Sequence, residues 1–181
     1  MYLRPDTFVI FDRVRSPRPE FRKTWLLQAM KRPERAGPHW VVTNGRGRLF
    51  VQTLLPEDPR VVLVSGEDLY AYDGRSFPPS REGGPAPECR LEVSPPRPAT
   101  TDLFLHVLTA ADSGTAAVPA GRLGLQGGEV VAAVGEAKVG FRTDGTGGWV
   151  ERGGARTPLG GRWSRGRLRR RPAGSRGAGV S

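Results

Sequence analysis

Short apolar runs that end at turn-forming residues are the feature that most constrains the fold of this chain. Three of them stand out at irregular spacing: FVIFDRV at 8–14, RLFVQTLLP at 48–56 and RLEVSPPRPATTDLFLHVL at 90–108. Each is rich in β-branched and aromatic residues and is bounded by Pro, Gly or Asp, which is typical of strands joined by turns. The runs therefore predict an all-β chain, an antiparallel β-sandwich of about ten short strands.

The same pattern along the rest of the sequence gives the individual strands. Gly and Pro are abundant, at 25 and 17 residues, and they punctuate the runs. Asn44-Gly45 predicts a tight hairpin between the strands on either side of it, because both residues tolerate positive φ. The dipeptides Asp73-Gly74 and Asp144-Gly145 are weaker signals of the same kind. The expected strands span 7–14, 23–29, 39–43, 48–54, 60–65, 68–72, 89–94, 102–109, 129–134, 137–142 and 148–151.

The strand at 102–109 differs from the others because both of its faces are apolar. In DLFLHVLT the odd-numbered and the even-numbered positions from 103 to 108 are apolar, apart from His106. A strand of this kind is expected mid-sheet, between two layers. Two stretches predict loops instead, namely PPSREGGPAPE at 78–88 and the Gly- and Ala-rich residues 113–128.

The positive charge of the chain is concentrated near its C-terminal end. The chain has 28 basic and 18 acidic residues, a net charge of +10, and residues 161–181 hold seven arginines and no acid. Residues 1–160 therefore carry 21 basic against 18 acidic groups and are only mildly basic. We expect residues 1–155 to form the β-sandwich. Residues 156–181 are expected to be a disordered Arg/Gly-rich tail, because this segment has no periodicity and few apolar groups.

Several classes of protein and site are not expected. No apolar run approaches the roughly 20 residues of a transmembrane helix, and the first residues show no small-residue cleavage site of a signal peptide. The single cysteine, Cys89, excludes an internal disulfide framework and is expected to be a small buried side chain. His39 and His106 have no Cys or carboxylate cluster near them in the sequence, so we expect no metal and no cofactor. We also expect no catalytic residue, because no Ser, His and Asp set has motif support.

The apolar runs also carry a family resemblance through their order and spacing. FVIFDRV at 8–14, KTWLL at 23–27, RLFVQTLLPED at 48–58 and CRLEVSPPRPATTDLFLHVL at 89–108 together resemble the C-terminal β-sandwich of heparinase II/III-like polysaccharide lyases. The resemblance covers residues 2–150. It implies a periplasmic or secreted parent enzyme, with an α-helical toroid before the sandwich. Such an enzyme cleaves acidic, uronic-acid-containing polysaccharides such as glycosaminoglycans or alginate by β-elimination.

The sequence departs from the family's pattern at points that bear on activity. The family's catalytic Tyr, Asn and His come mostly from the toroid, and a further His comes from an early His-x-His segment; this chain has neither segment. Gln28 stands where the family often has His, and Cys89 stands where it often has an aromatic residue. We therefore expect an incomplete sandwich from the end of a lyase, inactive without its helical toroid.

The candidate binding residues are aromatic and basic side chains. Aromatic rings can stack on sugar rings, and basic groups can meet carboxylates or sulfates. If 68–72 is a strand, its two tyrosines share one face, because side chains repeat every second residue. His106 is either a buried, hydrogen-bonded core residue or part of the site, His39 is expected at a turn or strand edge, and Trp25 is expected to pack in the core. The predicted substrate-binding residues are Arg13, Arg22, Lys23, Tyr70, Tyr72 and His106.

Three functions follow as hypotheses. The first is the C-terminal β-sandwich of a lyase, which supports the toroid and walls one side of a cleft for an acidic polysaccharide. The second is a stand-alone carbohydrate-binding or structural β-sandwich module. The third is polyanion binding by counterion release, through Arg165, Arg167, Arg169, Arg170 and Arg171. A membrane is not an expected partner because no apolar run is long enough to cross it. A nucleic acid is not expected either, since residues 1–160 are only mildly basic.

Overall fold

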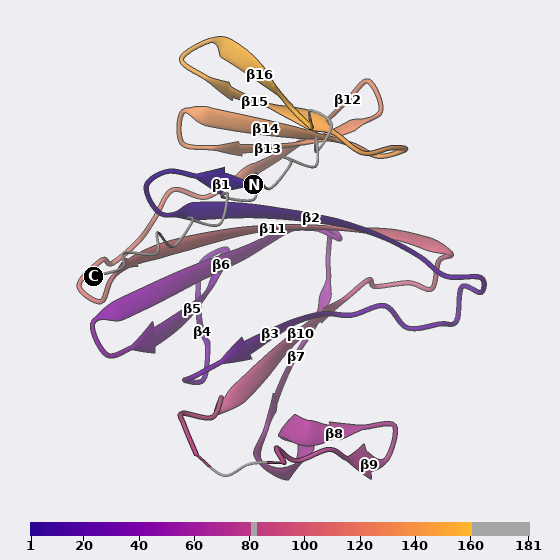
Figure 1. Cartoon of the computed structure of the whole chain (residues 1–181), viewed down its shortest axis with the longest axis vertical. Coiled ribbons are helices and arrows are strands. Elements are labelled where there is room, and N and C mark those ends of the chain that lie inside the picture. Colours follow the sequence, from indigo (N-terminus) through magenta and orange to yellow (C-terminus); the bar gives the residue numbers. More distant parts are fainter. Residues whose placement is uncertain (81–82, 161–181) are drawn as a thin grey trace, which may run out of the picture.

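The chain folds into antiparallel strands with a single short 3-10 helix among the residues described. The computed structural model describes residues 1–80 and 83–160 (Figure 1). The helix, η1, spans Gly66–Tyr70. The strands are β1 Tyr2–Leu3, β2 Thr7–Arg15, β3 Trp25–Ala29, β4 Glu34–Ala36, β5 His39–Asn44, β6 Gly47–Leu55, β7 Arg60–Ser65, β8 Ala71–Tyr72, β9 Arg75–Ser76, β10 Cys89–Ser94, β11 Thr101–Asp112, β12 Arg122–Gln126, β13 Glu129–Val134, β14 Ala137–Arg142, β15 Gly148–Arg152 and β16 Ala155–Leu159. The all-β prediction is confirmed.

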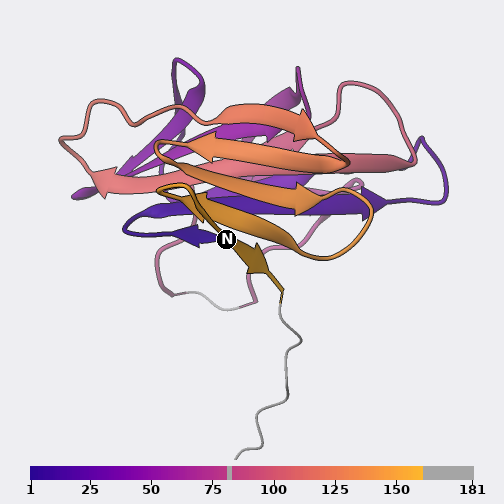
Figure 2. The same cartoon turned by 90° about the horizontal axis from the view of Figure 1, so that it is seen from above.

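The strands form three stacked layers. A six-stranded sheet in the order β1-β2-β11-β6-β5-β4 lies in the middle. The five-stranded sheet β12-β13-β14-β15-β16 covers one of its faces, and the three-stranded sheet β3-β10-β7 covers the other (Figures 1 and 2). The small β8-β9 hairpin lies beyond the three-stranded sheet. The predicted packing of one sheet on another therefore occurs on both faces of the middle sheet.

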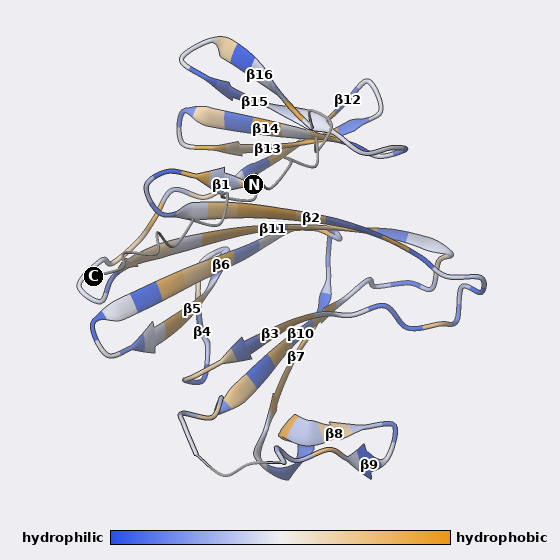
Figure 3. Ribbon diagram, viewed as in Figure 1, coloured by the Kyte–Doolittle hydropathy of each residue, from blue (hydrophilic) through white to orange (hydrophobic). Residues whose placement is uncertain are grey.

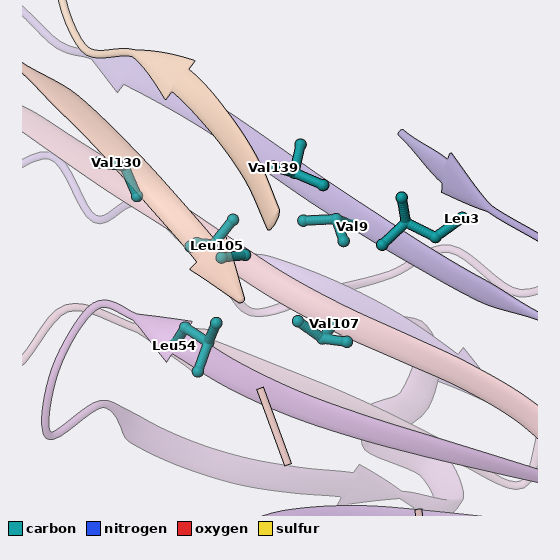
Figure 4. Packing of buried hydrophobic residues seen from close by; sticks show 8 residues of the cluster. Leu3, Val9, Leu54, Leu105, Val107, Val130 and Val139 are labelled. Atoms are coloured by element: carbon teal, nitrogen blue, oxygen red, sulfur yellow. The ribbon is translucent and has the colours of Figure 1, made fainter. Parts of the chain in front are cut away.

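The position of β11 in the middle sheet explains why both faces of this strand are apolar. It pairs with β2 on one side and with β6 on the other. Its alternating residues therefore face both outer layers, as predicted, and Figure 3 shows apolar residues concentrated along β2 and β11. On the face toward the five-stranded sheet lies a cluster of buried residues drawn in Figure 4: Leu3, Val9, Leu54, Leu105, Val107, Val130, Ala132 and Val139.

A second, smaller core lies between the middle sheet and the three-stranded sheet. Every second residue of β10 is fully buried, beginning with Cys89, as the sequence predicts. From the middle sheet, Phe104 and His106 point into this core, and the His106 ring stacks on Trp25 with ring centroids 3.8 Å apart. The expectation that Trp25 packs in the core is confirmed. Because β10 alternates so regularly, the residues between its buried ones must lie on the outer face of the sheet.

Glycine-containing turns set the hairpins. The turn after Asn44 joins β5 to β6 as predicted, with Gly45 at φ 58°. Asp73 and Gly74 both have positive φ, at 49° and 72°, and close the β8-β9 hairpin. Positive φ at both central residues is the geometry of a type I′ turn. In the β5-β6 hairpin Asn44 is paired with Gly47, so the central residues are Gly45 and Arg46, and of these only Gly45 has positive φ.

Four expectations about local structure need correction. Residues 66–70 form η1, so the strand predicted at 68–72 is wrong except at its last two residues. The predicted loop at 113–128 contains β12, and β16 pairs along its length with β15 beyond the boundary set at 155. The short strands β1, β4 and β9 also escaped prediction, so there are sixteen strands in the described residues instead of about ten.

Candidate functional site

A cleft of about 660 Å³ lies on the outer face of the three-stranded sheet, beside the β8-β9 hairpin. Its volume is in the range of ligand-binding pockets. Polar, charged and aromatic side chains from three segments meet there: the approach to β3 and β3 itself, the start of the β8-β9 hairpin, and β10. The residues that line it are Arg22, Thr24, Leu26, Gln28, Tyr70, Ala71, Tyr72, Asp73, Arg90 and Glu92.

Strand alternation places the floor of the cleft. In β10 the buried residues point toward the core, so Arg90 and Glu92 point outward. Arg90 is paired with Gln28 across the β3-β10 ladder, and Glu92 is paired with Leu26. Residues directly opposite each other in an antiparallel pair share a face. The floor is therefore two cross-strand rows, one of Gln28 with Arg90 and one of Leu26 with Glu92.

Glu92 holds both arginines of the cleft. Its Oε1 accepts hydrogen bonds from Arg90 Nε, at 2.9 Å, and lies 2.9 Å from Arg90 Nη2. Its Oε2 accepts a hydrogen bond from Arg22 Nη2 at 2.9 Å. The Arg22 side chain is 57% exposed whereas that of Arg90 is 13% exposed. Arg22 therefore presents its remaining donors to the cleft, and Arg90 is mainly a structural anchor.

The tyrosines are positioned by backbone hydrogen bonds around η1. Arg90 Nη1 donates to the carbonyl of Leu69, whose side chain is buried. The next residue, Tyr70, accepts a hydrogen bond on its carbonyl from the backbone N–H of Phe77, at 2.8 Å. Tyr72, in β8, is 79% exposed, so its ring is free to contact a ligand. The aromatic wall of the cleft is thus tied to the sheet floor through Arg90.

The structure brings together three of the six residues predicted to bind substrate: Arg22, Tyr70 and Tyr72. The tyrosines meet for a different reason from the one predicted, because Tyr70 ends a 3-10 helix and only Tyr72 is in a strand. The sequence interpretation missed Arg90 and Glu92. The signal for them was present in CRLEVS, where charged residues alternate with apolar ones and so mark the solvent side of a half-buried strand.

Lys23 lies next to the cleft, but its ammonium group already interacts with other residues of the protein. Its ammonium lies 2.9 Å from Asp102 Oδ2 and donates to Ser16 Oγ at 3.1 Å. It also donates to the carbonyls of Phe21, at 3.2 Å, and Ala99, at 2.5 Å. The side chain is buried, so this placement corrects the expectation that Lys23 meets substrate directly.

His106 and Arg13 also lie away from the cleft. His106 is 0% exposed, and its Nδ1 is 3.2 Å from Thr53 Oγ1, so it is the buried core histidine that the sequence left as one alternative. Burial lowers its pKa to about 3, which keeps the ring neutral. Arg13 is exposed on β2 and donates to the carbonyl of Thr143, in the loop after β14. Direct substrate contact by His106 is excluded by this burial.

The remaining candidate groups have other roles or lie outside the described residues. His39 begins β5 and is buried edge-on against Phe50, with ring centroids 5.8 Å apart. Its pKa is lowered by burial and by the nearby Arg35 guanidinium. The predicted polyanion-binding arginines Arg165, Arg167, Arg169, Arg170 and Arg171 all fall in 161–181, outside the described part of the chain.

The described residues contain neither a cluster of metal-ligating side chains nor a helix suited to cross a membrane. Within 1–80 and 83–160 no three His, Cys, Asp or Glu side chains come together as a metal site. In the same ranges no helix has the length and apolar character needed to cross a bilayer.

Comparison with models of known protein families and with curated proteins gave no match to this chain.

Proposed function

We propose that the chain is a non-catalytic β-sandwich module that binds polysaccharide in the cleft formed by β3, β10 and the β8-β9 hairpin. The observation that carries this proposal is the gathering of Tyr70, Tyr72 and Arg22 in one cleft. An exposed ring beside a half-buried one offers flat apolar surface to the C–H face of a sugar. The donors and acceptors on the cleft floor suit sugar hydroxyls.

The cleft supports binding better than catalysis. Both oxygens of Glu92 already accept hydrogen bonds from guanidinium groups, so this carboxylate is poorly placed to take a proton from a substrate. Both histidines are buried, away from the cleft. The groups that remain accessible are those that orient a ligand, namely Arg22, Gln28 and the tyrosines.

The resemblance to heparinase II/III-like lyases supports an acidic polysaccharide as the ligand. In such an enzyme the module would be the C-terminal sandwich that walls a substrate cleft, and the chemistry would lie in the helical toroid. The same cleft would serve a stand-alone carbohydrate-binding module. Binding of an oligosaccharide by this chain is expected in either case, and it is therefore the property to test.

Calorimetric titration of the protein with a panel of oligosaccharides tests the proposal. The panel contains oligogalacturonates, alginate and heparin oligomers, and neutral cello- and xylo-oligomers. Tyr72→Ala should weaken binding roughly ten-fold, or about 1.4 kcal/mol, because it removes the exposed ring. Tyr2→Ala is the matched control, since Tyr2 is also exposed but lies on β1 in the middle sheet.

Deletion of residues 161–181 separates the cleft from the basic tail. Under the proposal, oligosaccharide affinity survives the deletion and falls roughly ten-fold on Tyr72→Ala. Loss of binding on deletion, with Tyr72→Ala behaving as the intact chain, would favour polyanion binding by the tail instead. Absence of binding to every member of the panel would reject the proposal.

A further inference from the structure

We infer that the binding surface continues past Arg22 into a second pocket, where Arg60 and Arg97 bind an anionic group, a carboxylate or sulfate, of the ligand. This pocket, of about 230 Å³, lies between the segment before β3, the start of β7 and the loop before β11. Arg22 lines both this pocket and the tyrosine cleft. The inference rests on the proposed function for the identity of the ligand, and on the residues of the second pocket for its charge.

The two pockets are consecutive positions along one sheet face. Strand alternation places Ser94 on the same face of β10 as Arg90 and Glu92. Arg90 and Glu92 line the cleft, and Ser94, which is itself buried, lines the second pocket. Arg60 is paired with Ser94 across the β7-β10 ladder and therefore shares its face. Four residues of strand span about 13 Å. An extended ligand that lies along β10 can therefore reach both pockets.

The charges of the two pockets differ. In the cleft, the arginines are balanced by Glu92, which binds both, and by Asp73. The second pocket is lined by four basic side chains and two acidic ones, Glu20 and Asp102, and Asp102 is already paired with Lys23. Among the described residues, neither Arg60 nor Arg97 forms an ion pair. The positive charge that is free for a ligand thus lies in the second pocket.

Lys23 holds together two of the segments that line the second pocket. Its ammonium ties the segment before β3, through the carbonyl of Phe21, to the loop before β11, through the carbonyl of Ala99. That loop is the sequence PPRP at 95–98, whose prolines have fixed φ and add stiffness next to Arg97. A guanidinium held on a stiff loop loses less entropy when it binds an anion. Lys23 is therefore a positioning residue for this pocket.

Sulfate is the simplest probe of the anion site. The full chain is titrated with sodium sulfate against sodium chloride at constant ionic strength, and backbone amide and arginine Nε–H signals are followed by NMR. We expect saturable shifts at Ser94, Arg97, Ala99 and Arg60. The double variant Arg60→Gln/Arg97→Gln should weaken sulfate binding at this site more than ten-fold, since it removes both guanidinium groups that donate charge-assisted hydrogen bonds to the anion. Shifts spread evenly over exposed arginines, or unchanged in the double variant, would overturn the inference.

Oligogalacturonate and its methyl ester separate this inference from the proposed function, because esterification removes the charge of each carboxylate and adds only a methyl group. The intact chain should prefer the acid form, and the double variant should lose that preference while still binding the ester. Arg46→Gln/Arg122→Gln, which removes two exposed arginines from the β5-β6 turn and β12, is the matched control and should keep the preference. Equal binding of acid and ester by the intact chain would refute the anion pocket and leave the tyrosine cleft standing. Localised sulfate binding without any saccharide binding would refute the cleft instead.

Discussion

The buried His106 makes a quantitative prediction about acid stability. Its ring is fully buried, stacked on Trp25, and hydrogen-bonded through Nδ1 to Thr53. Burial lowers the pKa of His106 to about 3 from its ordinary value near 6.5. The folded protein therefore keeps this histidine neutral at a pH where the unfolded chain already binds a proton.

The sign and size of the effect follow from that difference. Above pH 6.5 the ring is neutral in both states and His106 costs nothing. Below pH 6.5 His106 binds a proton in the unfolded state but not in the folded state. The free energy of unfolding therefore falls as the pH is lowered, until the pH reaches the pKa of His106 in the folded protein. The loss is about 2 kcal/mol at pH 5 and saturates at about 5 kcal/mol below pH 3.

Urea unfolding at pH 7 and pH 5 measures this loss. The chain has two histidines, so the variants His106→Gln and His39→Gln account for all histidine titration. His106→Gln should lose about 2 kcal/mol less stability than the intact chain between the two pH values. The pKa of His39 is also lowered, so His39→Gln should change the loss in the same direction.

An NMR titration of the folded protein measures the pKa of His106 directly, without a substitution. The His106 ring signals should show no titration between pH 7 and pH 5. Titration of His106 near pH 6.5 in the folded state, or an unchanged pH dependence in His106→Gln, would refute the reasoning.

Two further predictions concern packing and a buried ion pair. A Cβ on Gly140 would lie 2.4 Å from Trp149 Cε2, so Gly140→Ala should displace that ring and destabilise the protein by about 1–3 kcal/mol, with a shift in tryptophan fluorescence. An unchanged melting temperature would contradict this contact. Asp102→Asn should cost about 3 kcal/mol or more in chemical denaturation, because it leaves the Lys23 ammonium buried and unpaired. The added change Lys23→Met should recover part of that loss, and a failure to recover any would contradict the ion-pair explanation.

The layers of the fold could be predicted from the sequence wherever local patterns and tertiary contacts agree. The strand at 102–109 shows apolar residues on both faces, and the structure extends it to β11 and buries it between two layers. The strands β12 and β16 escaped prediction because each has only five residues, is interrupted by a Gly or a Pro, and is stabilised by pairing with a neighbour. The sequence does mark the turns beside them, as the dipeptides Gly127-Gly128 and Gly153-Gly154, and all four glycines have positive φ in the structure. Local hydrophobicity was too weak a guide there.

The site was harder to predict because it depends on contacts between distant segments. Arg22 and Glu92 lie far apart in the sequence and meet because β3 pairs with β10. Tyr72 joins them through a hairpin whose position depends on the hydrogen bond from Arg90 to the carbonyl of Leu69. Residue type alone cannot show that the side chain of Lys23 is buried while that of Arg22 is exposed. Among the aromatic and basic candidates, only tertiary pairing separates those that line the cleft, such as Arg22, from those that are buried, such as Lys23.

The most direct test of the saccharide cleft is an NMR measurement of contacts between a bound oligosaccharide and the aromatic rings of the protein. Two pairs of aromatic residues can be compared: the tyrosines that line the cleft, and the exposed, stacked pair Tyr2 and Phe8, with ring centroids 4.8 Å apart, on β1 and β2. The account predicts intermolecular NOEs from sugar protons to the rings of Tyr70 and Tyr72. NOEs to Tyr2 and Phe8, with none to the cleft tyrosines, would contradict it.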